Sequence, residues 1–214
     1  MIHILIASLG FLFFLGIAEI AKQLFQFPAD LTRKIAHMLS GVYAFFLPYY
    51  LTRDELILLS ILFVFILFIT KTFRMFESIH GVSRKTHGEI YFPLSLGFLA
   101  YFFLPEHLLA AQFGLLVLGF SDAIASIVGI EYGSHTVFIW GHKKSIEGSA
   151  AFLITTIFLI VIFLPSSSFL LYSIGLLGAI ALTFVELFSI RGLDNFFLPI
   201  LGASFFQYIL LALR

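Results

Sequence analysis

The chain has 214 residues, of which 61% are hydrophobic and only 11% are charged, and its formal net charge is zero. An ordinary soluble domain carries about 25% charged residues, so this composition excludes that class and indicates an integral membrane protein. The chain has no cysteine, which excludes disulfides and thiolate metal sites.

Eight apolar segments follow one another along the chain, separated by short polar connections. Most are long enough for a helix that crosses the ~30 Å hydrocarbon core, although the fourth would rise only about 24 Å. The sequence therefore predicts a single all-α domain over residues 1–214, a bundle of about eight transmembrane helices. The expected spans are residues 2–25, 32–50, 54–73, 89–104, 107–130, 146–164, 168–189 and 195–213.

The basic residues are divided unevenly between the two sides of this predicted bundle. Ten of the twelve lie in the odd-numbered connections or beside them. Because basic residues collect on the cytoplasmic side of membrane proteins, we expect these connections in the cytoplasm and both termini outside. The polar clusters described next all fall on this predicted cytoplasmic side. The ten residues are Lys22, Arg33, Lys34, Lys71, Arg74, Arg84, Lys85, Lys143, Lys144 and Arg191.

A carboxylate, Asp122, interrupts the fifth apolar segment. It shares one helical face with Ser126, Gly129 and Gly133. The small residues of this face are explained by close packing of another helix. A carboxylate at membrane depth is costly, so we expect Asp122 to be functional, either holding a cation or pairing with a lysine.

The sixth segment is preceded by glycine and two lysines, in the sequence Gly141-His142-Lys143-Lys144-Ser145. Free backbone N–H groups at a helix start, together with two ammonium groups, suit phosphate oxygens. The alternative is that the lysines only mark the cytoplasmic side, while Ser145 caps the helix and Glu147 complements its dipole. With Asp122 one hairpin away, a site for phosphate and Mg²⁺ is the better interpretation.

Two further groups of polar residues lie on the same predicted side. Glu186, Asp194 and Asn195 flank the last connection and, with Asp122, are candidate Mg²⁺ ligands, although Asp194 is also explained as a helix cap. Arg84, His87 and Glu89 precede the fourth segment, where Arg84 suits phosphate and either His87 or Glu89 suits a general base. Arg33, Lys34 and His37 share one helical face, which suits phosphate binding or snorkelling to lipid headgroups.

The order and spacing of these motifs are characteristic as a set. The pattern consists of Arg33-Lys34-x-x-His37, Gly88-Glu89-Ile-Tyr-Phe-Pro93-Leu94, Asp122-Ala-x-Ala-Ser-Ile-x-Gly129, Tyr132-Gly133, Lys143-Lys144-Ser145-x-Glu147-Gly148-Ser149, Glu186 and Asp194-Asn195-x-x-x-Pro199. It resembles the CTP-dependent lipid kinase family of dolichol, phytol and yeast-type diacylglycerol kinases, from about residue 30 to about residue 200. One departure is Ser121, where the family commonly has glycine before the aspartate.

The resemblance implies a phosphotransferase that moves a phosphoryl group from CTP, with Mg²⁺, to the hydroxyl of a long-chain isoprenoid alcohol. It places Mg²⁺ on Asp122, Asp194, Asn195 and Glu186, and the base at His87 or Glu89. The phosphate-binding set comprises Arg33, Lys34, His37, Arg84, Lys143, Lys144, Ser145, Glu147 and Gly148. The expected partners are therefore CTP, a lipid alcohol and the bilayer, with no nucleic acid.

Three other functions stay open at this point. Diacylglycerol kinase activity belongs to the same family. A phosphatidate cytidylyltransferase is suggested by a more distant likeness to CDP-diacylglycerol synthases in the stretch from Lys144 to Ser149. An ion-coupled transporter requires polar residues in both halves of the membrane, whereas the outer halves of these spans are almost wholly apolar.

Overall fold

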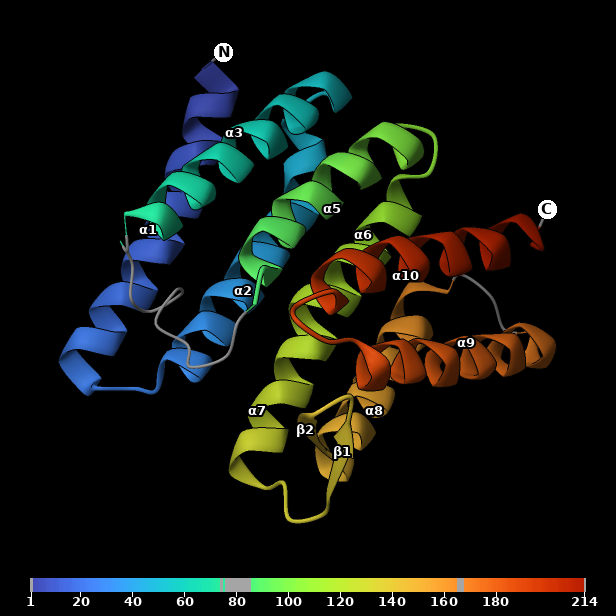
Figure 1. Cartoon of the computed structure of the whole chain (residues 1–214). Coiled ribbons are helices and arrows are strands. Elements are labelled where there is room, and N and C mark those ends of the chain that lie inside the picture. The colour runs from blue at the N-terminus through green and yellow to red at the C-terminus, as the bar shows by residue number, and fades with distance from the viewer. Residues whose placement is uncertain (1, 74, 76–85, 165–167, 214) are drawn as a thin grey trace.

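The computed structural model describes residues 2–73, 75, 86–164 and 168–213 (Figure 1). These residues form a helical bundle, so the predicted all-α membrane fold is confirmed. The helices are α1 (Ile2–Phe25), α2 (Ala29–Phe46), α3 (Arg53–Thr72), α5 (Gly88–Phe103), α6 (Leu108–Leu116), α7 (Ala123–Glu131), α8 (Ile146–Phe163), α9 (Phe169–Phe188) and α10 (Asp194–Leu211), with a short 3-10 helix over Leu47–Tyr49.

Most of these helices have the length and composition of membrane spans. A π-helical turn, Val117–Asp122, joins α6 and α7 into one continuous helix, Leu108–Glu131. Within the described ranges, six helices are long and apolar enough to cross a bilayer, and the chain is a multi-pass membrane protein. The other two, α2 and α5, differ because α2 carries Asp30, Arg33 and Lys34 and α5 is only 16 residues long.

Local signals in the sequence explain where two of the helices begin. Thr52 and Glu55 form a reciprocal capping box at the start of α3, with the Thr52 hydroxyl 3.3 Å from the Glu55 backbone nitrogen. Ser145 caps α8, because its hydroxyl accepts a hydrogen bond of 3.0 Å from the backbone N–H of Gly148. These caps set where α3 and α8 emerge from the apolar part of the bundle.

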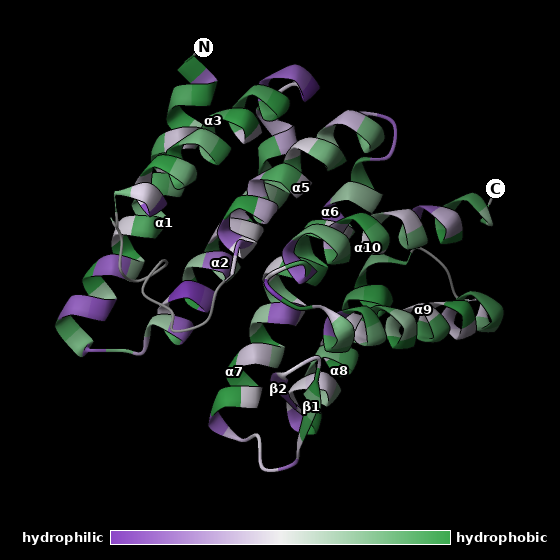
Figure 2. Ribbon diagram, viewed as in Figure 1, coloured by the Kyte–Doolittle hydropathy of each residue, from purple (hydrophilic) through white to green (hydrophobic). Residues whose placement is uncertain are grey.

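The continuous helix α6–α7 runs through the middle of the molecule. On one side α1, α2, α3 and α5 pack together, and on the other side α8, α9 and α10 do. Phe113 of α6 and Phe206 of α10 are fully buried and stack at 4.3 Å, which fixes α10 against the central helix. In Figure 2 the hydrophilic residues concentrate toward the helix ends, while the helix middles are hydrophobic. Asp122 of the central helix is an exception to this distribution.

The connection between α7 and α8 is a β-hairpin, whose two strands were not predicted. Strands β1 (Thr136–Ile139) and β2 (His142–Ser145) pair antiparallel, with Val137 opposite Lys144. The turn consists of Trp140 and Gly141, whose φ angles are 51° and 79°. Two consecutive left-handed residues are what a tight two-residue hairpin turn requires, and Gly141 adopts this conformation without strain. The sequence indicated only a flexible backbone here. In the structure the paired strands hold Lys144 in a fixed position.

Candidate active site

A polar cavity of about 290 Å³ lies where α2, α7, the hairpin, α8 and the α9–α10 connection meet. Regions far apart in the sequence supply its walls. The lining includes Asp30, Arg33, Lys34, Thr86, Asp122, Ser126, Gly129, His142, Lys143, Lys144, Ser145, Gly148, Ser149, Glu186, Arg191 and Asp194. Most of the residues singled out from the sequence therefore share one compartment.

Asp122 forms a buried ion pair with Lys34. The Lys34 Nζ atom donates to Asp122 Oδ2 at 2.5 Å, and the two residues are 6% and 2% exposed. The approach is possible because α2 and the π-helical turn touch through glycines: a Cβ added to Gly41 would lie 2.5 Å from the Cα of Gly119. The sequence left open whether Asp122 holds a cation or pairs with a lysine, and in the structure it pairs with Lys34 on α2. The π-helical turn also fits a functional position, since such turns are frequent at functional sites.

A second ion pair joins the hairpin to α9. Lys144 Nζ donates to Glu186 Oε1 at 2.5 Å and to the backbone carbonyl of Glu186 at 2.8 Å, and Ser149 Oγ donates to Glu186 Oε2 at 3.3 Å. Burial by itself lowers the pKa of Lys144, but the carboxylates of Glu186 and Asp194 outweigh it, so the net direction of the pKa is upward. Lys144 therefore stays a cation at the wall of the cavity.

The start of α8 faces the cavity because α7 packs closely against it. A Cβ added to Gly148 would lie 2.7 Å from the carbonyl oxygen of Ala125 and 3.3 Å from the Cα of Gly129. The glycines thus serve the close packing that the sequence suggested for them. The same close packing holds the capped N-terminus of α8, with the hydroxyl of Ser145, beside Lys144. A helix N-terminus in this position favours an anion.

The α9–α10 connection is locked against the start of α5. Arg191 and Gly192 have left-handed φ angles of 55° and 88°, and the backbone N–H of His87 donates to the Arg191 carbonyl at 3.1 Å. A Cβ on Gly192 would lie 2.5 Å from the Cα of Gly88, so only glycine fits at this contact. The turn places Asp194 in the polar cavity.

The four predicted Mg²⁺ ligands do not form a ready-made cage. Asp122 and Glu186 already hold lysines, and Asn195 lines a different cavity from the other three. In the part of the chain that the structure describes, no three His, Asp or Glu side chains gather at metal-binding distance. This donor set fits a Mg²⁺ ion that is held mainly by nucleotide phosphates, with one or two carboxylates of the protein.

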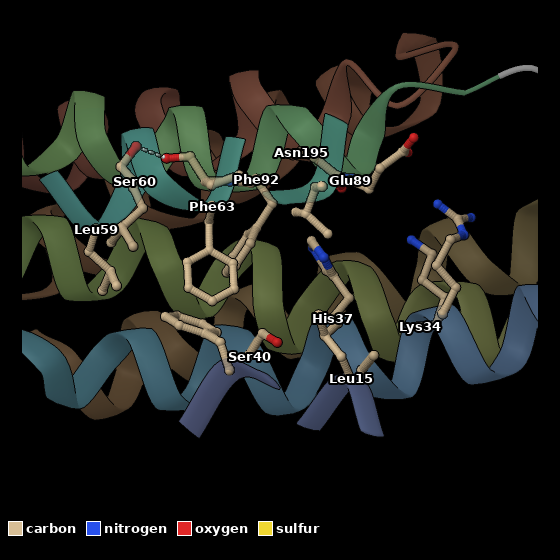
Figure 3. A pocket seen from close by; sticks show the side chains of 16 residues that line it. Leu15, Lys34, His37, Ser40, Leu59, Ser60, Phe63, Glu89, Phe92 and Asn195 are labelled. Atoms are coloured by element: carbon tan, nitrogen blue, oxygen red, sulfur yellow. Dashed lines mark hydrogen bonds between the residues drawn. The ribbon is translucent and has the colours of Figure 1, made fainter. Parts of the chain in front are cut away.

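A smaller apolar cavity of about 70 Å³ lies between α1, α2, α3 and α5 (Figure 3). Its wall shares Arg33 and Lys34 with the polar cavity, so the two spaces adjoin at the start of α2. Its lining among the described residues is Phe11, Leu15, Arg33, Lys34, Ala36, His37, Ser40, Leu59, Ser60, Phe63, Leu67, Glu89, Phe92, Pro93, Leu96 and Asn195. The sequence could not single out the residues of this lining, because apolar residues face lipid in every span.

The structure separates the two base candidates. Glu89 lines the apolar cavity and forms an ion pair with Lys71, whose Nζ also donates to the Thr86 carbonyl at 2.7 Å. The His87 side chain is exposed and belongs to the described lining of neither cavity. Its Nδ1 atom lies 3.4 Å from Lys71 Nζ. Lys71 had been interpreted only as a positive charge at a helix end, and no local motif marks it as part of this cluster.

Glu147 contacts the segment that precedes the hairpin. The Glu147 carboxylate accepts hydrogen bonds from Ser134 Oγ at 2.7 Å and from the backbone N–H of His135 at 3.0 Å. It ties the segment before the hairpin to α8 and is not in the described lining of the polar cavity, so its phosphate contact stays a prediction without support from this geometry. A carboxylate in the first turn satisfies nearby donors instead. Arg84 lies outside the described residues.

The amino-acid sequence was compared with those of known proteins. A phytol kinase from Synechocystis sp. is 29% identical over 193 residues, covering 86% of this chain and 81% of the relative. The chain is therefore similar to a known lipid kinase over most of its length. This similarity supports the lipid kinase relationship that the motifs indicated. No protein-family model matches the chain. No solved structure matches it either.

Proposed function

We propose that this lipid kinase relative transfers the γ-phosphoryl group of CTP to the hydroxyl of a long-chain isoprenoid alcohol such as phytol or a polyprenol. The observation that carries the proposal is the junction of the two cavities: the polar cavity and the apolar cavity share Arg33 and Lys34. A nucleotide and a lipid alcohol need such a shared boundary in order to react. The relative's name, phytol kinase, supports the same substrate class.

The polar cavity has the groups that phosphoryl transfer uses. The reaction is catalysed mainly by positioning and by stabilising charge on phosphate oxygens. Arg33, Lys143 and Lys144 supply cations, and the N-terminus of α8 supplies backbone donors. Mg²⁺ bound with the nucleotide, next to Asp122 and Asp194, would neutralise part of the phosphate charge.

The proposed reaction is a direct displacement. The hydroxyl oxygen of the alcohol forms a bond to the γ-phosphorus, the bond from that phosphorus to the β–γ bridging oxygen breaks, and CDP leaves. The hydroxyl proton passes to Glu89, the predicted base that lines the apolar cavity, and from there to water. We further propose that the polar cavity faces the cytoplasm, as the distribution of basic residues predicts, with both termini on the other side.

In the decisive experiment, purified protein in lipid is incubated with Mg²⁺ and with CTP that is labelled at either the γ- or the α-phosphate. Phytol, polyprenol, diacylglycerol and phosphatidate are each tested in a separate sample. The proposal predicts transfer of the γ-label to an isoprenoid alcohol and no transfer of the α-label to lipid. Transfer of the α-label to phosphatidate would instead identify a cytidylyltransferase, and γ-labelling of diacylglycerol alone would identify a diacylglycerol kinase. Parallel reactions with ATP, GTP and UTP test whether CTP is the preferred donor.

A further inference from the structure

The charged side chains of the apolar cavity lie at one end. His37, Lys34 and Glu89 lie at the end that adjoins the polar cavity, whereas Phe63 and Ser40 lie at the other end (Figure 3). Ser60 also lies there, but its hydroxyl is bound to the Pro93 carbonyl at 2.5 Å and is not available to a ligand. A ligand of this space therefore needs one polar terminus followed by an apolar body.

His37 is the polar group best placed to meet such a terminus. Its Nε2 atom is enclosed and has no hydrogen-bond partner among the described residues. A buried ring nitrogen without a partner is costly, so a ligand that binds it gains affinity. A hydroxyl both donates and accepts, and so it suits either tautomer of the ring. His37 also follows Arg33 and Lys34 by about one helical turn, which places a bound hydroxyl about 5 Å along α2 from the cations.

The size of the cavity limits how much of a lipid enters. A cavity needs about 10–15 Å³ to hold a single water molecule. The free volume of about 70 Å³ is several times this minimum, so it has room for a short terminal group of a lipid and not for a whole lipid chain. One isoprene unit has five carbons, and a whole phytol or polyprenol chain is several times larger. The cavity is not fully enclosed, so a longer tail has a way out toward the surrounding lipid.

From these observations we infer that the apolar cavity binds the hydroxyl-bearing isoprene unit of the substrate, with His37 Nε2 hydrogen-bonded to the hydroxyl and the remaining tail outside the cavity. This inference rests on the proposed function and adds a substrate-recognition site to it. It makes His37 a catalytic residue that touches the reacting hydroxyl, rather than one of the phosphate-binding groups. It also makes the enzyme selective for the first unit of the alcohol and indifferent to the length of the tail.

Two substitutions test the site. Ser40→Leu fills the apolar end of the cavity and is expected to raise the KM for the alcohol at least tenfold while leaving the KM for CTP unchanged. His37→Gln is expected to lower kcat/KM for the alcohol by about 10- to 100-fold, again without changing the KM for CTP. Ser204→Leu, an exposed position on α10, and His107→Gln, before α6, are matched controls outside both described linings.

The wild-type protein provides a test that does not depend on any variant folding. Alcohols of 15, 20 and more carbons that share the same first isoprene unit are compared in mixed micelles at equal surface fraction. The inference predicts kcat/KM values within about threefold of one another, and a clear fall for a straight-chain alcohol without the methyl branch. A kcat/KM that rises steeply with tail length, or folded Ser40 and His37 variants that behave like their controls, would overturn it. If the wild-type protein transfers no phosphoryl group to any alcohol, the proposed function itself fails.

Discussion

The buried pair of Lys34 and Asp122 allows the structural and chemical roles of a charged site to be separated. The N–O distance of 2.5 Å and side-chain exposures of 8% and 3% put both charges inside protein. At an effective dielectric constant near 20, the attraction amounts to roughly 6–7 kcal/mol, and desolvation of the two ions offsets most of it. Removing one partner leaves the other charge buried and uncompensated, at a cost of about 3–5 kcal/mol.

A double-mutant cycle of Lys34→Met and Asp122→Asn tests this pair. Each single variant is expected to melt about 6–20 °C below the wild type, from about 2–4 °C per kcal/mol for a chain of this size. The double variant buries no charge and should recover most of the lost stability. The melting temperature is measured in detergent or nanodiscs by loss of the folded protein on heating.

Activity must follow a different pattern in the same cycle. If Asp122 acts on the bound nucleotide, phosphoryl transfer stays at least 100-fold below wild type in the double variant, despite its recovered stability. That loss corresponds to about 2.7 kcal/mol of transition-state stabilisation. A double variant that regains activity along with stability would show that the pair is only structural. Single variants that melt like the wild type would refute the energetic argument itself.

Three further predictions follow from the same geometry. Gly41→Ala places a Cβ against Gly119 and should destabilise the protein by about 1–3 kcal/mol and reduce phosphoryl transfer. The control Gly16→Ala has open space around its Cβ, so it should change neither the melting temperature nor the activity. Lys144→Gln leaves the Glu186 carboxylate uncompensated, so it should both lower the melting temperature and raise the KM for CTP. Lys143→Gln, at an exposed position, should raise the KM for CTP without lowering the melting temperature. Equal losses of melting temperature in the two variants would contradict this prediction. Chelation of Mg²⁺ should abolish transfer without shifting the melting temperature of the nucleotide-free protein, and a marked shift would indicate a resident metal.

The helices could be predicted from the sequence because each span is an apolar run with a local boundary. The predicted start of the sixth span at residue 146 coincides with the helix that Ser145 caps. The β-hairpin was missed because its eight paired residues contain both aromatic and charged side chains, and only the conformation of Trp140 and Gly141 closes it. The π-helical turn before Asp122 has no local signature in an apolar run.

The site could be predicted only in part, because its pairings join distant residues. The sequence marked Asp122 and Lys34 separately, but they are 88 residues apart and nothing local links them. His87 and Glu89 looked equivalent in the sequence. Of these two residues, Glu89 lines the apolar cavity and His87 is not in its described lining. Glu147 matched a motif, yet its neighbours Ser134 and His135 take up its carboxylate.

The central claim is that a nucleotide and a lipid alcohol meet at the start of α2. The most direct measurement uses a photoreactive isoprenoid alcohol with its diazirine in the first isoprene unit, crosslinked in the presence of a non-hydrolysable CTP analogue and mapped by mass spectrometry. The structure predicts adducts on the α2 and α5 residues around His37 and Phe92, competed by unmodified alcohol. Competed adducts confined to α9 or to other helices away from the two cavities would contradict the account.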